Sequence, residues 1–296
     1  MSFVSEIGIV GLGLLGSALA ERLLGAGYAV LGFDIDRQRQ VALEKIGGRF
    51  ASLPELAQRC RVLIVAVFDT EQVEDVVAGR LLSAVGVNSG KIVLCASTCD
   101  PDRIAALAGR IEPQGLHLLE MPVSGTSEQL RQGHAVALIG GEPARLEQVV
   151  DIITAIFPSH FHIGPIGQAG RAKLAINLIL GLNRLALAEG LIFAERLQLE
   201  PARFLEVARQ SACYSQVMDS KGTKMLRGDF SPEGRARQTL KDVKLMLALA
   251  HRLGQDLPLA RLNAEILETC VRNGEGEEDN SIVIQEIRRR TLAAPE

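Results

Sequence analysis

The sequence has no excess of charge that would attract a polyanion. Its 296 residues contain 32 Lys and Arg against 35 Asp and Glu, which gives a formal net charge of −3. Proteins that bind nucleic acid or anionic membranes through general electrostatic attraction carry a positive excess. We therefore expect neither nucleic acid nor a membrane among the partners.

Targeting and membrane-spanning segments are also lacking. Residues 1–6 contain no basic stretch, and glycines soon interrupt the apolar residues that follow, unlike in a secretory signal. The most apolar span, 174–183, is shorter than the roughly 20 residues of a bilayer-crossing helix. It is also interrupted by Asn and Gly. These absences predict a cytoplasmic protein.

The few cysteines and histidines show no pattern of a metal site. The 5 cysteines are scattered, Cys95 and Cys99 do not have a zinc spacing, and the 5 histidines form no His-x-x-x-His pair. We interpret the cysteines as reduced and structural, and we expect no metal. The Gly-x-Ser-x-Gly turn of many serine hydrolases is missing too, which argues against Ser124 as a nucleophile.

What the sequence does contain is a glycine-rich turn between a predicted strand at 7–10 and a predicted helix at 17–24. In such a turn the first glycine makes the bend and the second lets the backbone approach a pyrophosphate. The third allows close helix packing, and the phosphates lie at the helix N-terminus. The residues that we expect to bind a dinucleotide are Gly11, Leu12, Gly13, Leu14, Leu15 and Gly16.

An acidic residue follows at the distance that a dinucleotide site requires. The predicted strand 28–33 ends at Asp34, 18 residues past the last glycine of the motif. About 20 residues are expected before the acid that binds the adenosine ribose hydroxyls. A carboxylate there repels the 2′-phosphate of NADP, so we expect NAD. NADP stays open, because Arg37 or Arg39 could hold that phosphate while Asp34 and Asp36 cap a turn.

Long apolar runs predict a parallel sheet that is covered on both faces. Residues 62–67 contain Val, Leu, Ile and Ala without alternation, and 91–96 is a similar strand. Ligands of doubly wound sheets bind at the carboxyl ends of such strands. Ser97 and Thr98 lie at such an end, although they could instead cap the next helix. Residues 122–126 could hold a carboxylate or form an ordinary β-turn.

The strand pattern ends near residue 163, and helical patterns replace it. We predict a Rossmann-type doubly wound α/β domain over 1–163 and an all-helical domain over 164–296 for substrate binding and dimerisation, joined by a long helix at about 168–197. An acidic loop at 274–280 is expected to be solvated. The other predicted segments are a helix at 144–156 in the first domain and helices at 202–209, 215–220, 236–254, 258–272 and 281–290 in the second.

The long helix is apolar on almost every face, which is typical of a helix inside a protein. No charged residue lies between Lys173 and Arg184. Lys173 and Asn177 are four residues apart and share a face, so an amine and an amide stand side by side. This pair is a candidate for chemistry. Alternatively, Lys173 extends to solvent beside a helix-capping amide.

In their order along the chain, five segments resemble the β-hydroxyacid dehydrogenase family. That family includes 3-hydroxyisobutyrate dehydrogenase, tartronate semialdehyde reductase and, more distantly, 6-phosphogluconate dehydrogenase. The segments are the glycine motif at 11–16, Ser97-Thr98-x-x-Pro101, Pro122-Val123-Ser124-Gly125, Gly167-x-x-Gly170-x-x-Lys173-x-x-x-Asn177 and Lys241-Asp242.

The resemblance implies an enzyme that transfers a hydride between NAD(P) and a small β-hydroxy acid or its semialdehyde, with Lys173 as general acid and base. The substrate-binding residues that it implies are Ser124, Gly125, Thr126, Asn177 and Lys241. The cofactor contacts beyond the glycine motif and Asp34 are Val67, Phe68, Thr98 and Lys241. An apolar helical domain further suggests a homodimer or homotetramer.

The chain also departs from the family pattern. Glu120 and Met121 replace a common Asp-Ala pair, and Thr126 replaces a glycine. These changes concern the substrate more than the reaction. Two alternatives remain: an imine reductase of the same architecture, although such enzymes usually lack the lysine, and a non-catalytic dinucleotide-binding module.

Overall fold

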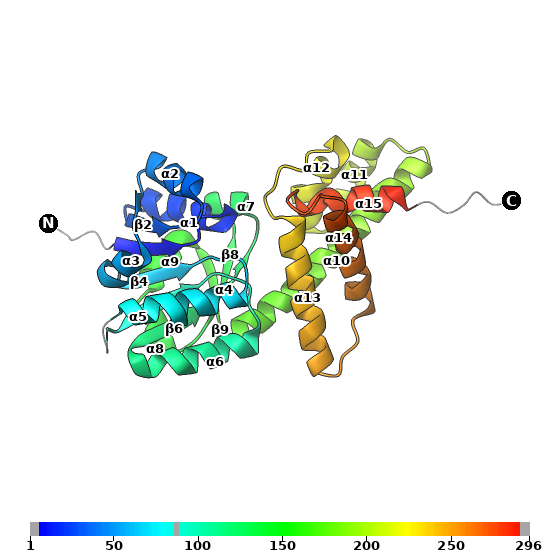
Figure 1. The fold of residues 1–296 in the computed structure, drawn as a ribbon. Helices are drawn as coiled ribbons and strands as arrows, with labels where there is room; N and C mark the ends of the chain where they lie inside the picture. The colour runs from blue at the N-terminus through cyan, green and yellow to red at the C-terminus, as the bar shows by residue number, and fades with distance from the viewer. Residues whose placement is uncertain (1–5, 86–88, 291–296) are drawn as a thin grey trace. The chain divides into compact units, whose positions relative to one another are not determined.

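The computed structural model describes residues 6–85 and 89–290. By its internal contacts the chain divides into two compact units, Met1–Lys173 and Leu174–Glu296. The first unit is α/β and the second is helical, and helix α10 (Gln168–Arg196) begins in the first and continues in the second (Figure 1). The predicted fold class is therefore confirmed. Residues 1–5, where the sequence indicates no secretory signal, lie outside the described part.

The first unit is built on a 9-stranded sheet with the order β3-β2-β1-β4-β5-β6-β8-β7, and β9 pairs with β8. The first six strands of this order are parallel and have the doubly wound arrangement. The strands are β1 (Glu6–Val10), β2 (Ala29–Phe33), β3 (Arg49–Phe50), β4 (Val62–Val65), β5 (Lys91–Cys95), β6 (Leu116–Glu120), β7 (Val123–Ser124), β8 (Val136–Gly140) and β9 (Ser159–Gly164).

Both faces of this sheet are buried under helices. Along β4, Val62 and Ile64 enter one hydrophobic cluster, whereas Leu63 and Val65 enter a second. This alternation follows from the two-residue period of a strand. It explains why the run lacks polar residues.

Helices of the first unit cover the sheet, and local sequence fixes several of their ends. Ser52 and Glu55 form a capping box at α3, and Asp100 caps α6 just before Pro101. The helices are α1 (Leu14–Gly25), α2 (Arg37–Lys45), α3 (Leu53–Arg59), α4 (Thr70–Glu74), α5 (Leu82–Ala84), α6 (Pro101–Ile111), α7 (Ser127–Arg131), α8 (Pro143–Glu147) and α9 (Val150–Ile156), with a π-helical segment η1 (Asp75–Leu81) and a 3₁₀ turn η2 (Glu112–Gln114).

Three sequence predictions need correction in this unit. The predicted strand 62–67 ends at Val65, and the predicted helix 144–156 is two helices, because the backbone at Val149 is not helical. The expected turn at 122–126 contains the short strand β7, which pairs with β8. The first two errors concern boundaries, which periodicity defines poorly. The third is a strand of two residues, which is too short to show a period.

The second unit buries an apolar core among its helices. Leu185, Leu191, Val243 and Leu267 belong to that cluster. Besides α10, the elements are α11 (Pro201–Arg209), the π-helical segment η3 (Met218–Gly222), α12 (Thr223–Arg227), α13 (Ala236–Arg252), α14 (Pro258–Arg272), the 3₁₀ turn η4 (Asn280–Ile282) and α15 (Val283–Arg289). The helix predicted at 215–220 therefore begins later and continues through α12.

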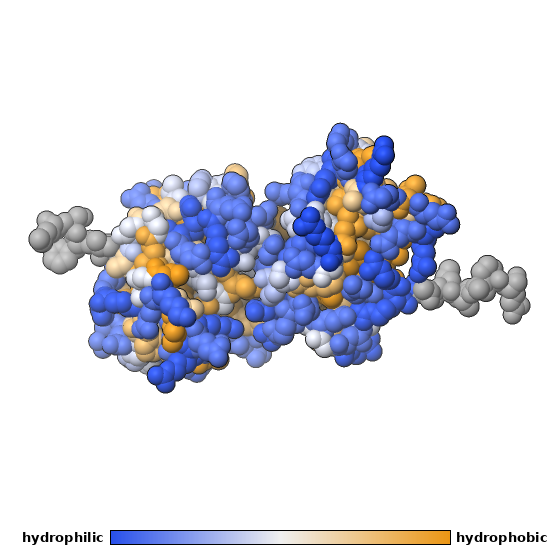
Figure 2. Space-filling view, turned by 90° about the horizontal axis from the view of Figure 1, so that it is seen from above, coloured by the Kyte–Doolittle hydropathy of each residue, from blue (hydrophilic) through white to orange (hydrophobic). Residues whose placement is uncertain are grey.

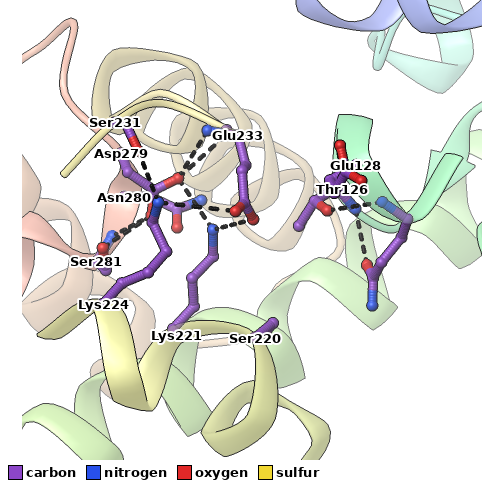
Figure 3. A network of polar contacts seen from close by, with 12 residues as sticks. Thr126, Glu128, Ser220, Lys221, Lys224, Ser231, Glu233, Asp279, Asn280 and Ser281 are labelled. Atoms are coloured by element: carbon purple, nitrogen blue, oxygen red, sulfur yellow. Dashed lines mark hydrogen bonds and ion pairs between the residues drawn. The ribbon is translucent and has the colours of Figure 1, made fainter. Parts of the chain in front are cut away.

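The acidic loop at 274–280 was expected to be solvated, and this is wrong only for its end. Residues 274, 277 and 278 are exposed, but Asp279 is 0% exposed. Its carboxylate lies 2.9 Å from the ammonium of Lys221, which also contacts Glu233 at 3.1 Å (Figure 3). Asp279 also accepts hydrogen bonds from the backbone amides of Glu233, Gly234 and Ser281. Burial alone raises the pKa of Asp279, but Lys221 and these amides outweigh it and hold the pKa below its ordinary value.

Helix α10 is more apolar than the span 174–183 alone suggested. By length and composition it could cross a membrane, with a mean hydropathy of 1.5 over its most apolar window. A core helix of a soluble protein meets the same criterion. Only 33% of that window is buried within the chain itself. The single chain therefore leaves much of this apolar helix uncovered.

Candidate functional site

The glycine motif forms a tight turn from β1 into α1. Gly11 has φ +93°, and a Cβ there would lie 2.5 Å from the carbonyl oxygen of Ala66. A Cβ on Gly16 would lie 1.8 Å from the carbonyl oxygen of Gly11, so the helix starts directly against the turn. At Gly13 the space is open, with the nearest neighbouring atom at 3.6 Å. This loop therefore has the close packing and the open backbone that a pyrophosphate site needs.

The N-terminus of α1 can bind an anion. Its N-cap residue is Gly13, and no side chain caps the helix. Backbone N–H groups at such a terminus have no intrahelical acceptor and carry the positive end of the helix dipole. These residues therefore fit the phosphates of a dinucleotide.

Asp34 is tied to the glycine loop and is only 5% exposed. Its Oδ2 accepts a hydrogen bond from the amide of Leu12 at 2.7 Å, and its Oδ1 accepts one from the amide of Asp36 at 2.9 Å. Asp36 caps α2. Asp34 was expected either to bind the ribose or to hold a turn. It does hold this turn, and it also lies beside the glycine loop, so the two roles are compatible.

Two further side chains lie around Asp34. Arg39 donates to Asp34 at 3.3 Å and pairs with Asp36 at 3.4 Å, and its guanidinium is the nearest group to Gly13. Ile35 is 90% exposed, although it is apolar. Ile35 was not among the predicted cofactor-binding residues. An apolar residue directly after the acidic residue of a dinucleotide site was the signal that could have identified it.

Side chains after β4 and β5 connect the carboxyl ends of these strands. The hydroxyl of Ser97 donates to the carbonyl of Val67 at 2.7 Å, and Ser97 is buried. Val67, Phe68 and Thr98 are partly exposed. Ser97 and Thr98 do not cap the next helix, because Asp100 does. The structure thus brings three of the predicted cofactor contacts to one edge of the sheet.

The segment with Ser124 and Gly125 leads into α7. Gly125 has φ +137°, and a Cβ there would meet that of Ala135 at 3.0 Å. Thr126 forms a capping box: its hydroxyl accepts from the amide of Gln129 at 3.1 Å, and its own amide donates to the Gln129 side chain at 2.8 Å (Figure 3). Thr126 therefore starts a helix, whatever else it contacts.

The start of α10 is attached to the sheet through Glu120. This carboxylate ends β6 and is 4% exposed. It accepts hydrogen bonds from the amides of Gly167 at 2.6 Å and Gly170 at 3.0 Å. Burial raises the pKa of Glu120, and the backbone hydrogen bonds oppose that shift. Lys173 follows on the same helix and is only 6% exposed, which argues against its extending to solvent.

In the second unit, Asp242 connects two of the predicted substrate ligands. Its Oδ2 accepts from the amide nitrogen of Asn177 at 3.0 Å, and its Oδ1 pairs with the ammonium of Lys241 at 3.0 Å. Asp242 is 7% exposed. The sequence reasoning gave it no role of its own, although it stands next to Lys241 in the motif.

Arg184 is a second residue without an assigned role. Its Nε is buried and has no hydrogen-bond partner among residues 6–85 and 89–290, and burial lowers the pKa of the guanidinium to about 10. For a metal, the described residues contain no suitable group of three or more His, Cys, Asp or Glu.

The fold and the glycine loop define an NAD(P)-dependent oxidoreductase with a Rossmann-type domain and a helical domain. Residues 6–164 match the NAD binding domain of 6-phosphogluconate dehydrogenase. Residues 167–287 match the NAD-binding domain of NADP-dependent 3-hydroxyisobutyrate dehydrogenase. The chain belongs to the β-hydroxyacid dehydrogenase family and resembles its 3-hydroxyisobutyrate dehydrogenases.

Named relatives agree with this family. Glyoxylate/succinic semialdehyde reductase 2 of Arabidopsis thaliana is 28% identical over 96% of this chain and 79% of its own. L-threonate dehydrogenase of Cupriavidus necator is 29% identical over 95% of each chain. The human cytokine-like nuclear factor N-PAC is 28% identical over 94% of this chain, which spans 50% of that protein.

Solved structures have the same fold. A 3-hydroxyisobutyrate dehydrogenase from Salmonella typhimurium is 26% identical, with a TM-score of 0.87 over 95% of this chain and 99% of its own. Psf3, in complex with NADP⁺ and 2-OPP, is 25% identical with the same score and coverage. An imine reductase from Pseudomonas sp. is 18% identical, with a TM-score of 0.64 over 96% and 99%, and it shares the fold alone.

Proposed function

We propose that this oxidoreductase interconverts a small β-hydroxy acid, similar to 3-hydroxyisobutyrate, and its semialdehyde, with Lys173 as general acid and base. The observation that carries the proposal is the buried amine of Lys173 on a helix whose first turn is attached to the sheet. The relatives named for succinic semialdehyde and L-threonate support this substrate class.

Each proposed ligand has a chemical task. When bound, the nicotinamide takes or gives a hydride at the carbon that carries the hydroxyl. Lys173 accepts the hydroxyl proton through Nζ during oxidation and returns it during reduction. Ser124, through its hydroxyl, and Gly125, through its amide, bind the substrate carboxylate.

Three further side chains complete the proposed substrate site. Asn177 orients the reacting hydroxyl. One N–H of its amide donates to Asp242, and the second N–H can donate to the oxygen of that hydroxyl, whose single proton goes to Lys173. Lys241 supplies a positive charge near the substrate and the cofactor, and Thr126 narrows the carboxylate pocket.

The proposed dinucleotide site comprises the glycine motif at 11–16 together with Asp34, Val67, Phe68, Thr98 and Lys241. We also assign Ile35 to the adenine face, since its 90% exposure leaves an apolar surface beside Asp34. We propose NAD as the preferred cofactor because Asp34 is an anion and repels a 2′-phosphate. Arg39 is the group that would favour NADP. The domain assignment of 1–163 to the dinucleotide and 164–296 to substrate and dimerisation is part of this proposal.

A substrate panel tests the proposal. The panel contains 3-hydroxyisobutyrate, L-serine, D-glycerate, L-threonate, and succinic and tartronate semialdehydes, each with the oxidised or reduced forms of NAD and NADP. We expect a change of nicotinamide absorbance with at least one hydroxy acid, faster with NAD. A cyclic imine is assayed beside this panel, and turnover of that compound alone would favour an imine reductase. Cofactor binding without turnover of any compound would favour a non-catalytic module.

We further propose a cytoplasmic homodimer or homotetramer. Several large apolar side chains of the helical unit are exposed, and Figure 2 shows apolar surface among its polar side chains. They are Ile179, Phe193 and Leu197 on or near α10 and Leu259 and Leu262 on α14. Light scattering coupled to gel filtration gives the mass, and a monomer at micromolar concentration would contradict this proposal.

A further inference from the structure

Glu120 joins the sheet to the helix that carries Lys173. It ends β6, and in the antiparallel pairing of β6 with β8 it stands opposite Gly140. One carboxylate oxygen accepts from the amide of Gly167 and the other from that of Gly170. Gly170 lies three residues before Lys173. The contact therefore fixes the helical turn from which the amine extends.

Glycines make room for this carboxylate on two sides. A Cβ on Gly140 would lie 2.4 Å from Oε2 of Glu120, and a Cβ on Gly170 would lie 2.8 Å from Oε1. Gly167 has φ +93°, a conformation that side chains disfavour. The surroundings are thus shaped around both oxygens. This fit requires a side chain with the length of glutamate.

From this geometry we infer that Glu120 is a positioning residue, which holds the first turn of α10 so that Lys173 stands at the reacting hydroxyl. The inference rests on the proposed role of Lys173. Glu120 itself touches backbone amides and takes no part in the chemistry. A displacement of about 1 Å at a reacting group can cost a hundredfold in rate, so the effect of this contact on turnover can be large.

Charge makes the contact sensitive to pH. Only the ionised carboxylate offers an acceptor at both oxygens without a competing proton. Burial raises the pKa of Glu120, the amides of Gly167 and Gly170 lower it, and Arg171 on α10 lowers it further. Cys95 on β5 is the other titratable group that interacts with it. Activity should therefore fall on the acid side at a higher pH than an exposed glutamate would give.

Glu120→Gln is the first test, because it keeps the shape and replaces one acceptor oxygen with a donor. We expect kcat for semialdehyde reduction to fall about tenfold or more and the Kd for NADH to change less than about twofold. The acid limb of the kcat profile should disappear in this direction, in which Lys173 acts as the acid and limits the rate only at high pH. Asp102→Asn is the matched control, because it breaks the exposed 2.7 Å ion pair between Arg171 and α6. Its kcat should change less than about twofold.

A pair of variants tests the fit to glycine. Gly140→Ala should push Oε2 away from Gly167 and lower kcat. Glu120→Asp withdraws the carboxylate by one methylene and relieves the closest contact, while the contacts of the added methyl group with Ala169, at 3.1 and 3.3 Å, remain in both backgrounds. Adding Gly140→Ala to Glu120→Asp should therefore lower kcat much less than it does in the wild type. Equal, additive losses in both backgrounds would overturn the inference.

Hydrogen exchange gives a readout that does not need turnover. In the protein without cofactor, amides in residues 165–175 should exchange at least about tenfold faster in Glu120→Gln, while the rest of the first unit is unchanged. Unchanged exchange together with unchanged kcat would overturn the inference, as would faster exchange throughout the unit. If Glu120→Gln exchanges faster in residues 165–175 but the wild type turns over no substrate, the proposed function fails and the role of Glu120 in holding the helix stands.

Discussion

The two units hold their buried polar groups in different ways. In the first, carboxylates accept from backbone amides at close approaches that glycines permit, as Asp34 does at the amide of Leu12 and Glu120 at that of Gly170. In the second, buried carboxylates also pair with lysines, as Asp242 does with Lys241 and as Asp279 does with Lys221 in addition to its backbone amides. Backbone partners fix geometry, and ionic partners carry charge. The two units should therefore respond differently to substitution.

The largest effect is expected in the glycine loop. Gly16→Ala places a Cβ 1.8 Å from a backbone oxygen that cannot move away, so the loop must distort. We expect NADH affinity to fall more than about a hundredfold. Gly13→Ala is the control, since the nearest atom lies at 3.6 Å. It should leave the melting temperature unchanged and still weaken NADH binding about tenfold or more, because the backbone approach to the pyrophosphate is blocked. Normal NADH binding by Gly13→Ala, measured by fluorescence titration, would contradict the assigned site.

The buried ion pair of the second unit should dominate its stability. Lys221→Met leaves Asp279 charged, 0% exposed and without its cation. The expected loss in the free energy of unfolding is about 3–5 kcal/mol. Arg59→Met breaks the exposed pair with Glu6 in the first unit and should cost much less, because solvent screens this pair. Urea unfolding measures both, and equal losses would remove the contrast between the units.

Acid should destabilise the second unit through the same pair. Because the pKa of Asp279 is lowered in the folded state, its contribution is fully present above the pKa of an unfolded aspartate. The contribution is lost as the pH falls through the folded-state value. Asp279→Asn should therefore flatten the acid side of the stability curve of the second unit, as followed by thermal unfolding. An unchanged pH slope would show that Asp279 does not control it.

A smaller effect is expected at Asp242. Asp242→Asn keeps an acceptor for Asn177 but removes the carboxylate that pairs with Lys241 at 3.0 Å. Oδ1 of Asp242 pairs with Lys241 by charge and makes no hydrogen bond within the described part of the chain. Losing that pair should lower kcat/KM by about fivefold. NADH binding serves as the control and should change less. A matching loss in the melting temperature, with kcat/KM intact, would mean that the carboxylate only stabilises the fold.

The smallest effect concerns Arg39. It pairs with Asp34 and Asp36 at the surface, where such pairs contribute about 1 kcal/mol or less. Arg39→Ala should change KM for NAD less than about threefold and raise KM for NADP more. The ratio of the two values of kcat/KM measures the preference. A larger loss with NAD than with NADP would contradict Arg39 as the group that favours NADP.

Local signals made much of the first unit predictable. The glycine motif and Asp34 act through neighbouring backbone, so a short stretch of sequence describes them. A cap of α6 was considered at Ser97 or Thr98, whereas Asp100 forms it. The order of five segments added the resemblance on which Ser124, Thr98 and Lys241 depend. Hydrophobic periodicity also predicted α10. This helix is more exposed than a pattern that is apolar on almost every face predicts.

Contacts between distant residues could not be predicted. Asp279 lies in an acidic stretch that indicated a solvated loop, and only the approach of Lys221, 58 residues away, explains its burial. Glu120 was visible only as a departure from the family pattern, because Gly167 and Gly170 lie 47 and 50 residues further on. Strand β7 was not predicted, because two residues are too few to show the alternation of apolar and polar side chains that marks a strand.

The most direct measurement of the central claim is the single-turnover rate of Lys173→Ala with the substrate that the panel identifies. Lys173→Ala should react at least about a hundredfold more slowly than the wild type, with NADH affinity nearly unchanged, because the general acid and base is gone. A rate within about threefold of the wild type would contradict the account, since another group would then have to move the proton.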